Sequence, residues 1–369
     1  MSTYLDGART SFELPDRLAA GEPPEARGVA RDRVRLLVAR ADGQQHASFS
    51  DIPTILEPGD LLIVNTSSTR AAAVEALRPT GEQIIVHFST PLDDGSWIVE
   101  FRSPDGTSSI EGMHAEETVV LPSAMPLHVI GPLLSTRART RLWRVWFDGA
   151  VEPHLAEHGQ PIAYSYVRGR WPLSAYQTVF AREHASAEMP SAARPFTHKL
   201  VTELISGGVN FAPIVLHCGV SSLEAGELPL DERFVVSPTT AWLVNETRTA
   251  GGRVVAVGTT SVRALETVAR ADGTVAAGAG WTNLVLGPGR PARAVDALIT
   301  GWHAPGASHL ALLEAVAGPE LVQAAYDAAL AAGYLWHEFG DSCLLLPERA
   351  LLQRHIANRN GRVSSERRG

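Results

Sequence analysis

The chain has 369 residues, with 32 Lys and Arg against 40 Asp and Glu, so its formal net charge at pH 7 is -8. This length suggests about two domains, and 45% hydrophobic with 20% charged residues is typical of a globular protein. The acidic balance argues against a general nucleic-acid binder, although it leaves room for one local basic patch.

Cysteine usage and hydropathy indicate the compartment. The two cysteines, Cys218 and Cys343, are far apart in the sequence, which excludes a disulfide-rich secreted scaffold and fits a reducing environment. The first residues carry no apolar signal core, and no run of about 18 apolar residues occurs. We therefore expect a cytoplasmic protein with no membrane-spanning segment.

The N-terminal part predicts two buried strands, at 34–39 and at 61–64, and the second strand ends at Asn65. From about residue 71, turns rich in Pro, Gly and Asp separate short β-type runs at 83–88, 96–101, 117–121, 127–130 and 142–147. This spacing is typical of a small antiparallel barrel or sandwich. The last run overlaps a basic stretch, which is either a solvated strand face or a phosphate-contacting patch. Its arginines are Arg137, Arg139, Arg141 and Arg144.

After Gly149, strand and helix patterns alternate. Helices are predicted at 198–205, from the cap pair Ser237-Pro238 to 251, and at 262–269, 308–317 and 320–332. Strands are predicted at 211–216, 253–257, 283–286 and 294–299. We expect an α/β body (a mixed sheet with helices) from 1–70 and 150–357, an inserted small antiparallel β-barrel at 71–149, and a disordered basic tail at 358–369.

The segment VVAVGTTSVRALE, 254–266, carries the strongest local indication of a binding site. A strand ends at Gly258, and Thr259, Thr260 and Ser261 stand where the next helix begins. Free N–H groups and the positive end of the helix dipole suit a carboxylate, a phosphate or sugar hydroxyls there. Arg263 adds a fixed charge. The alternative is an ordinary helix start followed by an exposed arginine.

Polar residues also follow other predicted strands. Asn65 ends one strand, His217 follows 211–216, and His303 follows the run that begins near Asp296. Ligands collect at the carboxyl ends of strands in open α/β sheets. Two histidines in such positions could serve as general acid and base, although each alone could be a structural histidine.

One apparent metal motif carries little weight. The sequence HLAEH, 154–158, has the spacing of an inverted zinc-protease motif. Pro153 and the Gly-Gln-Pro that follows it confine this segment to roughly one helical turn, and no second ligand helix is evident. We therefore expect no metal.

Taken together, several segments resemble one family in both order and spacing: the S-adenosylmethionine:tRNA ribosyltransferase-isomerases of queuosine biosynthesis. The segments are GDLL at 59–62 with Asn65, YQTVFA at 176–181, LH at 216–217, VVAVGTTSVR at 254–263, GWT at 280–282, VDALIT at 295–300 with His303 and Pro305, and FGD at 339–341.

This resemblance implies an α/β body with an inserted barrel, and it implies the reaction. Family members transfer and isomerise the ribosyl part of S-adenosylmethionine, a co-substrate, onto 7-aminomethyl-7-deazaguanine in tRNA, releasing adenine and methionine. The chemistry needs a base, an acid and a seat for the methionine carboxylate. We assign His217, His303 and Asp296 to catalysis. The residues expected to bind substrate are Asn65, Arg70, Thr259, Thr260, Ser261, Arg263 and Asp341.

The sequence departs from the family pattern at polar positions. Residues 66–69 lack the usual aspartate, Pro195 stands for a histidine, 221–225 replace Gly-Thr-Phe-Arg-Pro, and Gly306 replaces a lysine. Two alternatives therefore stay open: a paralogue with a small-molecule acceptor, and a non-catalytic RNA-binding protein. Arg263 with His303 in one pocket favours an enzyme. A continuous basic face with Arg139, Arg141 and Arg144 beside that pocket favours tRNA. A pocket closed by Arg194 and Pro195, with no basic approach, favours a small acceptor.

Overall fold

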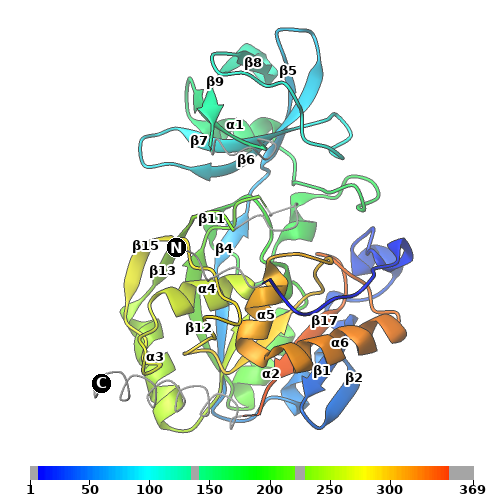
Figure 1. Ribbon diagram of the computed structural model, residues 1–369, viewed down its shortest axis with the longest axis vertical. Helices are drawn as coiled ribbons and strands as arrows, with labels where there is room; N and C mark the ends of the chain where they lie inside the picture. The colour runs from blue at the N-terminus through cyan, green and yellow to red at the C-terminus, as the bar shows by residue number, and fades with distance from the viewer. Residues whose placement is uncertain (1–6, 134–140, 221–228, 349–369) are drawn as a thin grey trace, which may run out of the picture. The chain divides into compact units, whose positions relative to one another are not determined.

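The computed structural model describes residues 7–133, 141–220 and 229–348, and the chain forms two compact units (Figure 1). The first unit comprises Met1–Thr66, Ser191–Leu216 and Ser222–Gly369, and the second comprises Ser67–Pro190 with His217–Ser221. The predicted tail at 358–369, the segment 221–225, Arg137 and Arg139 lie outside the described residues.

A nine-stranded mixed sheet is the centre of the first unit. In spatial order its strands are β15 (Gly278–Thr282), β13 (Glu232–Val236), β12 (Asn210–Leu216), β3 (Leu61–Asn65), β14 (Val254–Val257), β16 (Ala297–Thr300), β17 (Ser342–Leu346), β1 (Arg35–Arg40) and β2 (Gly43–Ser48). The strands β12, β3, β14 and β16 are parallel to one another, whereas β17 and β1 run in the opposite direction.

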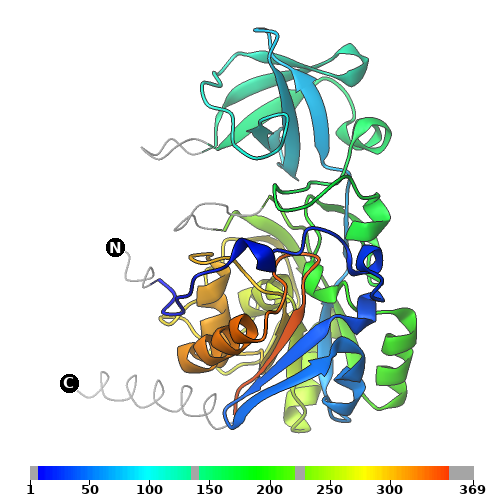
Figure 2. The same ribbon diagram turned by 90° about the vertical axis from the view of Figure 1, so that its right-hand side faces the viewer.

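Helices cover both faces of this sheet, which explains the composition of its central strands. Every residue of β3, β14 and β16 is buried, as expected for parallel strands enclosed on two sides. Figure 2 shows α2 on one side of the sheet and α5 and α6 on the other. The helices of this unit are α2 (His198–Ser206), α3 (Pro238–Thr249), α4 (Thr259–Thr267), α5 (His309–Ala317) and α6 (Pro319–Ala331).

The directions of the strands gather several chain segments at one edge of the sheet. Ile63 pairs with Ala256, so Asn65 and Gly258 follow two residues later at the same edge. Thr300 pairs with Cys343, which brings the segment after β16 and the segment before β17 to this edge as well. We call it the carboxyl edge, because the four parallel strands end there.

The second unit contains a closed antiparallel barrel. Its strands in spatial order are β10 (Leu142–Phe147), β7 (Trp97–Arg102), β6 (Gln83–Pro91), β5 (Ala73–Leu77), β8 (Thr118–Leu121) and β9 (Met125–Pro132). Alternate residues point inward and form an aromatic core, in which Phe88 makes edge contacts with Trp97 and Phe147.

Three further elements complete this unit. Helix α1 (Val151–His158) follows the barrel, and β4 (Ser67–Thr69) pairs in parallel with β11 (Glu183–Ser186). The unit therefore continues to Pro190, beyond the insertion expected at 71–149. In both units, short 3-10 helices occur at Asp16–Leu18, Pro24–Arg27, Arg31–Arg33, Phe49–Thr54, Pro122–Ala124, Leu173–Tyr176 and Ser191–Ala193.

Most predicted elements are confirmed within one or two residues, and three predictions need correction. The strand at 283–286 is wrong: the strand lies at β15, and the Leu284 backbone bonds instead to the side chains of Arg263 and Thr282. Helix α4 begins at Thr259, three residues early. Helix α1 spans eight residues, not one turn, because Pro153 stands in the first turn, where its missing N–H breaks no intrahelical bond.

The buried carboxylate of Glu266 on α4 predicts a measurable contribution to this fold. Glu266 Oε1 accepts the backbone N–H groups of Arg293, Ala294 and Val295 at 2.8, 2.7 and 3.2 Å, which fixes the approach to β16. We expect Glu266→Ala to lower the free energy of unfolding by about 2–4 kcal/mol, because these donors lose their acceptor. Urea titration measures this loss. Glu266→Gln, which keeps one acceptor oxygen, should lose clearly less; equal losses would contradict the assignment.

Candidate active site

The amino end of α4 lies at the carboxyl edge. Gly258 connects β14 to the helix with φ 87 and ψ 155, a conformation that side chains rarely allow. Thr259 and Thr260 are half-buried, and the N-cap residue, Gly258, has no side chain that could cap the first turn. Ser261 is buried and donates its hydroxyl to Val257 O at 2.8 Å, so it is a structural hydroxyl. The N–H groups of this turn and the helix dipole favour an anionic group.

Asn65 fixes this helix start relative to the sheet. Its amide is fully buried, and it donates to Leu216 O at 2.8 Å and accepts from Leu216 N at 3.1 Å. The same Nδ2 lies 3.4 Å from Thr260 Oγ1. Asn65 therefore joins the ends of β3, β12 and α4. Its role in the described structure is to position Thr260.

Arg263 is buried, and its guanidinium is bonded to other groups of the protein. Its guanidinium forms an ion pair with Glu232 and donates to Leu284 O at 3.2 Å and Leu230 O at 3.1 Å. It also donates to Thr282 O at 3.3 Å. The residue thus holds β13 and the segment after β15 against α4, rather than presenting an exposed charge.

Three histidines gather after β16. The rings of His303 and His309 are stacked, with centroids 4.5 Å apart and planes 4° apart. Burial lowers the pKa of His303, and His309 and His337 lower it further. Burial lowers the pKa of His309 and of His337 to about 4 each, with Arg263 contributing at His309. All three imidazoles are therefore neutral at pH 7, and His303 Nε2 lies 3.1 Å from Thr300 Oγ1.

Asp341 organises the segment that carries His337. Its carboxylate accepts hydrogen bonds from the N–H groups of Arg35 and Leu335, both at 2.8 Å, so each carboxylate oxygen is bonded to the backbone. Gly340 is required here, because a Cβ would lie 2.3 Å from Leu335 O. His337 adopts φ 73, an uncommon conformation for a residue with a side chain. The tight loop thereby holds this imidazole beside His303.

A small pocket opens beside this loop. Arg194 forms an ion pair with Glu25 at 2.8 Å and lies over the Phe339 ring at 5.2 Å. The pocket thus combines a neutral imidazole with a charge-compensated arginine. Its lining residues are Val34, Ser191, Ala192, Arg194, Pro195, Gly301 and His337–Ser342.

Asp296 lies at the other end of the strands. It precedes β16, and its Oδ2 accepts Val254 N at 2.9 Å at the start of β14. Its Oδ1 lies 3.6 Å from Arg248 Nη1. The structure therefore does not bring Asp296 together with Asn65, Thr260 or His303.

His217 and Arg70 belong to the second unit. His217 Nδ1 lies 2.8 Å from Ser67 Oγ, and burial and the charge of Arg70 lower its pKa. Arg70 is buried and pairs with Glu152 at 2.7 Å, donates to Ala185 O, and lies over the Trp97 ring at 5.1 Å. Its charge is thus largely compensated by protein groups.

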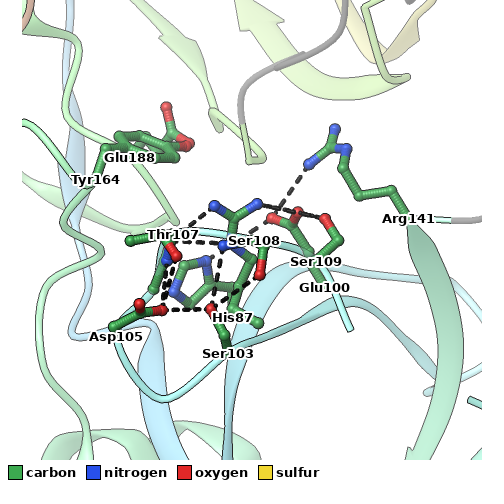
Figure 3. Close-up of polar contacts among 12 residues, drawn as sticks. His87, Glu100, Ser103, Asp105, Thr107, Ser108, Ser109, Arg141, Tyr164 and Glu188 are labelled. Carbon is green, nitrogen blue, oxygen red and sulfur yellow. Dashed lines mark hydrogen bonds and ion pairs between the residues drawn. The ribbon is translucent and has the colours of Figure 1, made fainter. Parts of the chain in front are cut away.

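The described arginines of the predicted basic stretch also form ion pairs. Figure 3 shows Arg141 directed at Glu100, and the ion-pair distance is 3.1 Å. Arg102 pairs with the same carboxylate at 2.9 Å. Burial raises the pKa of Glu100, but His87 and the two arginines lower it to about 2. Arg141 is therefore buried and does not form an open basic face, and Arg144 pairs with Asp94.

Sequence reasoning missed four residues of this arrangement: Ser67, Glu232, His309 and His337. His309 stands six residues after His303, and this spacing could have indicated a pair. Ser67 and Glu232 contact partners that are 150 and 31 residues away in the sequence, and no local sequence pattern indicates such contacts. Among the described residues, no group of three His, Cys, Asp or Glu side chains could hold a metal ion. No helix in the same part of the chain is long and apolar enough to cross a membrane.

Comparisons with known proteins cover nearly the whole chain. A family model described as "Queuosine biosynthesis protein" matches residues 8–345. The S-adenosylmethionine:tRNA ribosyltransferase-isomerase of Symbiobacterium thermophilum is 36% identical over 91% of this chain and 98% of its own length. The protein of the same name from Acidiphilium cryptum is also 36% identical, over 92% and 98%. The crystal structure of a Thermotoga maritima S-adenosylmethionine tRNA ribosyltransferase is 29% identical, with TM-score 0.51, over 91% and 99%.

The neutral histidines predict that stability depends on pH. The unfolded chain binds protons on histidine near pH 6.5, whereas the folded forms of His309 and His337 resist protonation down to about pH 4. Stability is therefore fully present above about pH 6.5 and falls as the pH drops towards 4, by on the order of 1 kcal/mol per histidine between pH 7 and 5.

Urea midpoints at about pH 7, 6 and 5 measure this loss. His309→Leu should flatten the dependence, because one coupled site disappears. His198→Gln, at an exposed histidine of α2, is the control and should leave the slope unchanged. An unchanged slope for His309→Leu would contradict a neutral His309.

Proposed function

The chain belongs to the queuosine biosynthesis protein family, and we propose that it acts as an S-adenosylmethionine:tRNA ribosyltransferase-isomerase. The observation that carries this proposal is similarity over nine tenths of the chain to proteins of that name. The reaction moves the ribosyl part of S-adenosylmethionine onto 7-aminomethyl-7-deazaguanine in tRNA, and adenine and methionine leave.

The start of α4 is the proposed binding site for the methionine carboxylate or the ribose hydroxyls. The N–H groups of the first turn favour an anion, and the half-buried hydroxyls of Thr259 and Thr260 add hydrogen-bonding partners. Asn65 holds Thr260 in place. In this proposal Ser261, Arg263 and Asp341 act by positioning the backbone, and Asp296 has no direct role.

His303 is the proposed base that removes the proton next to the sulfonium. A base must be unprotonated before the reaction, and burial keeps this imidazole neutral at pH 7. Its stacked neighbour His309 and the contact with Thr300 restrict the ring. His217 and Arg70 are the proposed contributions of the second unit to substrate handling.

tRNA is the proposed acceptor and the cytoplasm the proposed compartment. Two buried free cysteines are compatible with a reducing environment. The ion pairs of Arg141 and Arg144 leave fewer free charges for phosphate than the sequence suggested. The first assay therefore has to distinguish tRNA from the alternative, a small-molecule acceptor.

The first test measures adenine and methionine released from S-adenosylmethionine, with and without tRNA bearing the 7-aminomethyl-7-deazaguanine precursor. We expect release that depends on this tRNA. His303→Gln should lower kcat by roughly 10²–10⁴-fold, the usual contribution of a positioned base. His198→Gln is the control and should keep wild-type activity. Release that is equal without tRNA would contradict the proposed acceptor.

Arg263→Ala tests the positioning role of the arginine. Glu232 would lose its partner, so we expect the free energy of unfolding to fall by roughly 2–4 kcal/mol and S-adenosylmethionine to bind more weakly. Calorimetric titration and urea unfolding measure the two effects. Glu232→Gln should destabilise less, because it keeps a neutral acceptor. Unchanged affinity in Arg263→Ala would remove the residue from the site.

A further inference from the structure

The segment that carries His303 has no regular structure of its own. Residues 301–308 lie between β16 and α5 and form neither helix nor strand, so their backbone groups need hydrogen-bond partners from elsewhere. For His303, both partners are aromatic side chains. The His303 N–H donates to Tyr326 Oη at 3.3 Å, and the His303 carbonyl accepts from Trp336 Nε1 at 3.0 Å. The backbone of His303 is thus held on both sides of its Cα.

The two aromatic side chains that hold His303 are fixed by their own packing. Tyr326 lies on α6, Trp336 precedes β17, and both are buried. Their rings pack against Trp302, the residue before His303, with centroid distances of 5.0 Å for Tyr326 and 5.3 Å for Trp336. The same pair therefore contacts the ring of one residue and the backbone of the next.

The N-terminal part of the chain packs against this aromatic pair. The Phe12 ring lies 4.9 Å from the Tyr326 ring and 6.2 Å from the Trp336 ring. Trp336 N donates to Leu18 O at 2.7 Å, and Trp336 O accepts from Ala20 N at 3.2 Å. Trp336 is therefore held at its ring and at both backbone groups, which leaves it little freedom to move away from His303.

The contacts of the His303 ring and those of its backbone have different consequences. His309 stacks on the imidazole and Thr300 Oγ1 lies 3.1 Å from Nε2, so these two residues restrict the orientation of the ring. Tyr326 and Trp336 instead fix the point from which the side chain extends. A base must lie within hydrogen-bond reach of the proton that it removes, and a displacement of about 1 Å can lower the rate on the order of 100-fold.

We propose that Tyr326 and Trp336 are positioning residues that hold the backbone of His303 so that its imidazole reaches the substrate proton. The proposal rests on the proposed role of His303 as the base. In it neither aromatic side chain touches the substrate, and both act through His303. Because a displaced base slows the chemical step without removing a binding contact, loss of either hydrogen bond should lower kcat and leave KM nearly unchanged.

The hydrogen bond to Tyr326 can be tested without substrate. In the full-length protein labelled with ¹⁵N-histidine, the backbone amide signal of His303 is assigned by its loss in His303→Gln. Hydrogen exchange of this amide should be slow in the wild type and about tenfold faster or more in Tyr326→Phe, which keeps the ring and removes Oη. Equal exchange rates in the two proteins would overturn the proposal.

Tyr334→Phe is the matched control for this measurement. Tyr334 belongs to the same aromatic cluster, since its ring lies 5.8 Å from Trp302, and its hydroxyl lies 2.9 Å from His46 Nδ1. The substitution therefore removes an equivalent buried contact that does not involve His303. It should leave the exchange of the His303 amide unchanged, and an acceleration equal to that in Tyr326→Phe would contradict a specific hold on His303.

The kinetic test separates positioning from a general loss of stability. Tyr326→Phe and Trp336→Phe should each lower kcat about tenfold with little change in KM, the effect of one lost hydrogen bond, whereas Tyr334→Phe should keep both constants. In a His303→Gln background, Tyr326→Phe should lower kcat no further, because a positioning residue acts through its partner. The same tenfold loss in both backgrounds would contradict the proposal.

The two proposals can fail separately. Adenine release that depends on tRNA, together with equal kcat values for Tyr326→Phe and Tyr334→Phe, would contradict only the positioning role. Absence of tRNA-dependent release, together with faster exchange of the His303 amide in Tyr326→Phe alone, would contradict the proposed function and support the hold of Tyr326 on His303.

Discussion

The common direction of β12, β3, β14 and β16 is the constraint on which the candidate site depends. Of these strands β3, β14 and β16 are buried on both faces, so a shift of one residue would move their apolar side chains out of their contacts. Their fixed register brings Asn65, the start of α4 and the approach to His303 to one edge.

The sequence predicted the parts of this arrangement that depend on local pattern. Strand ends and the hydroxyl-rich start of α4 follow from apolar runs that stop at polar residues, and Asn65 and Thr260 were found in this way. The partners of Arg263 and Asp341 could not be found, because they are chosen by the tertiary fold. A buried arginine and an exposed one have the same local sequence, and only Glu232 and the carbonyls around Arg263 distinguish them.

Four arginines are buried and form ion pairs inside this protein. Arg70, Arg141, Arg194 and Arg263 are all buried and each pairs with a carboxylate. The number of basic residues in the sequence therefore overestimates the exposed positive charge that could bind a polyanion. His303, His309 and His337 behave in the complementary way: burial keeps them neutral, and a neutral imidazole can accept or donate a hydrogen bond at pH 7.

The pairing of β1 with β17 has a consequence for biosynthesis. Arg35 and Asp341, which meet beside these strands, are 306 residues apart. All strands of the barrel emerge from the ribosome before β17, so the barrel can close while the body still lacks one of its inner strands. Until then the β1–β2 hairpin presents an open edge, and an isolated hairpin is marginally stable and able to pair with other chains. The late strand thus ends a long vulnerable interval, during which protection of the nascent chain would matter most.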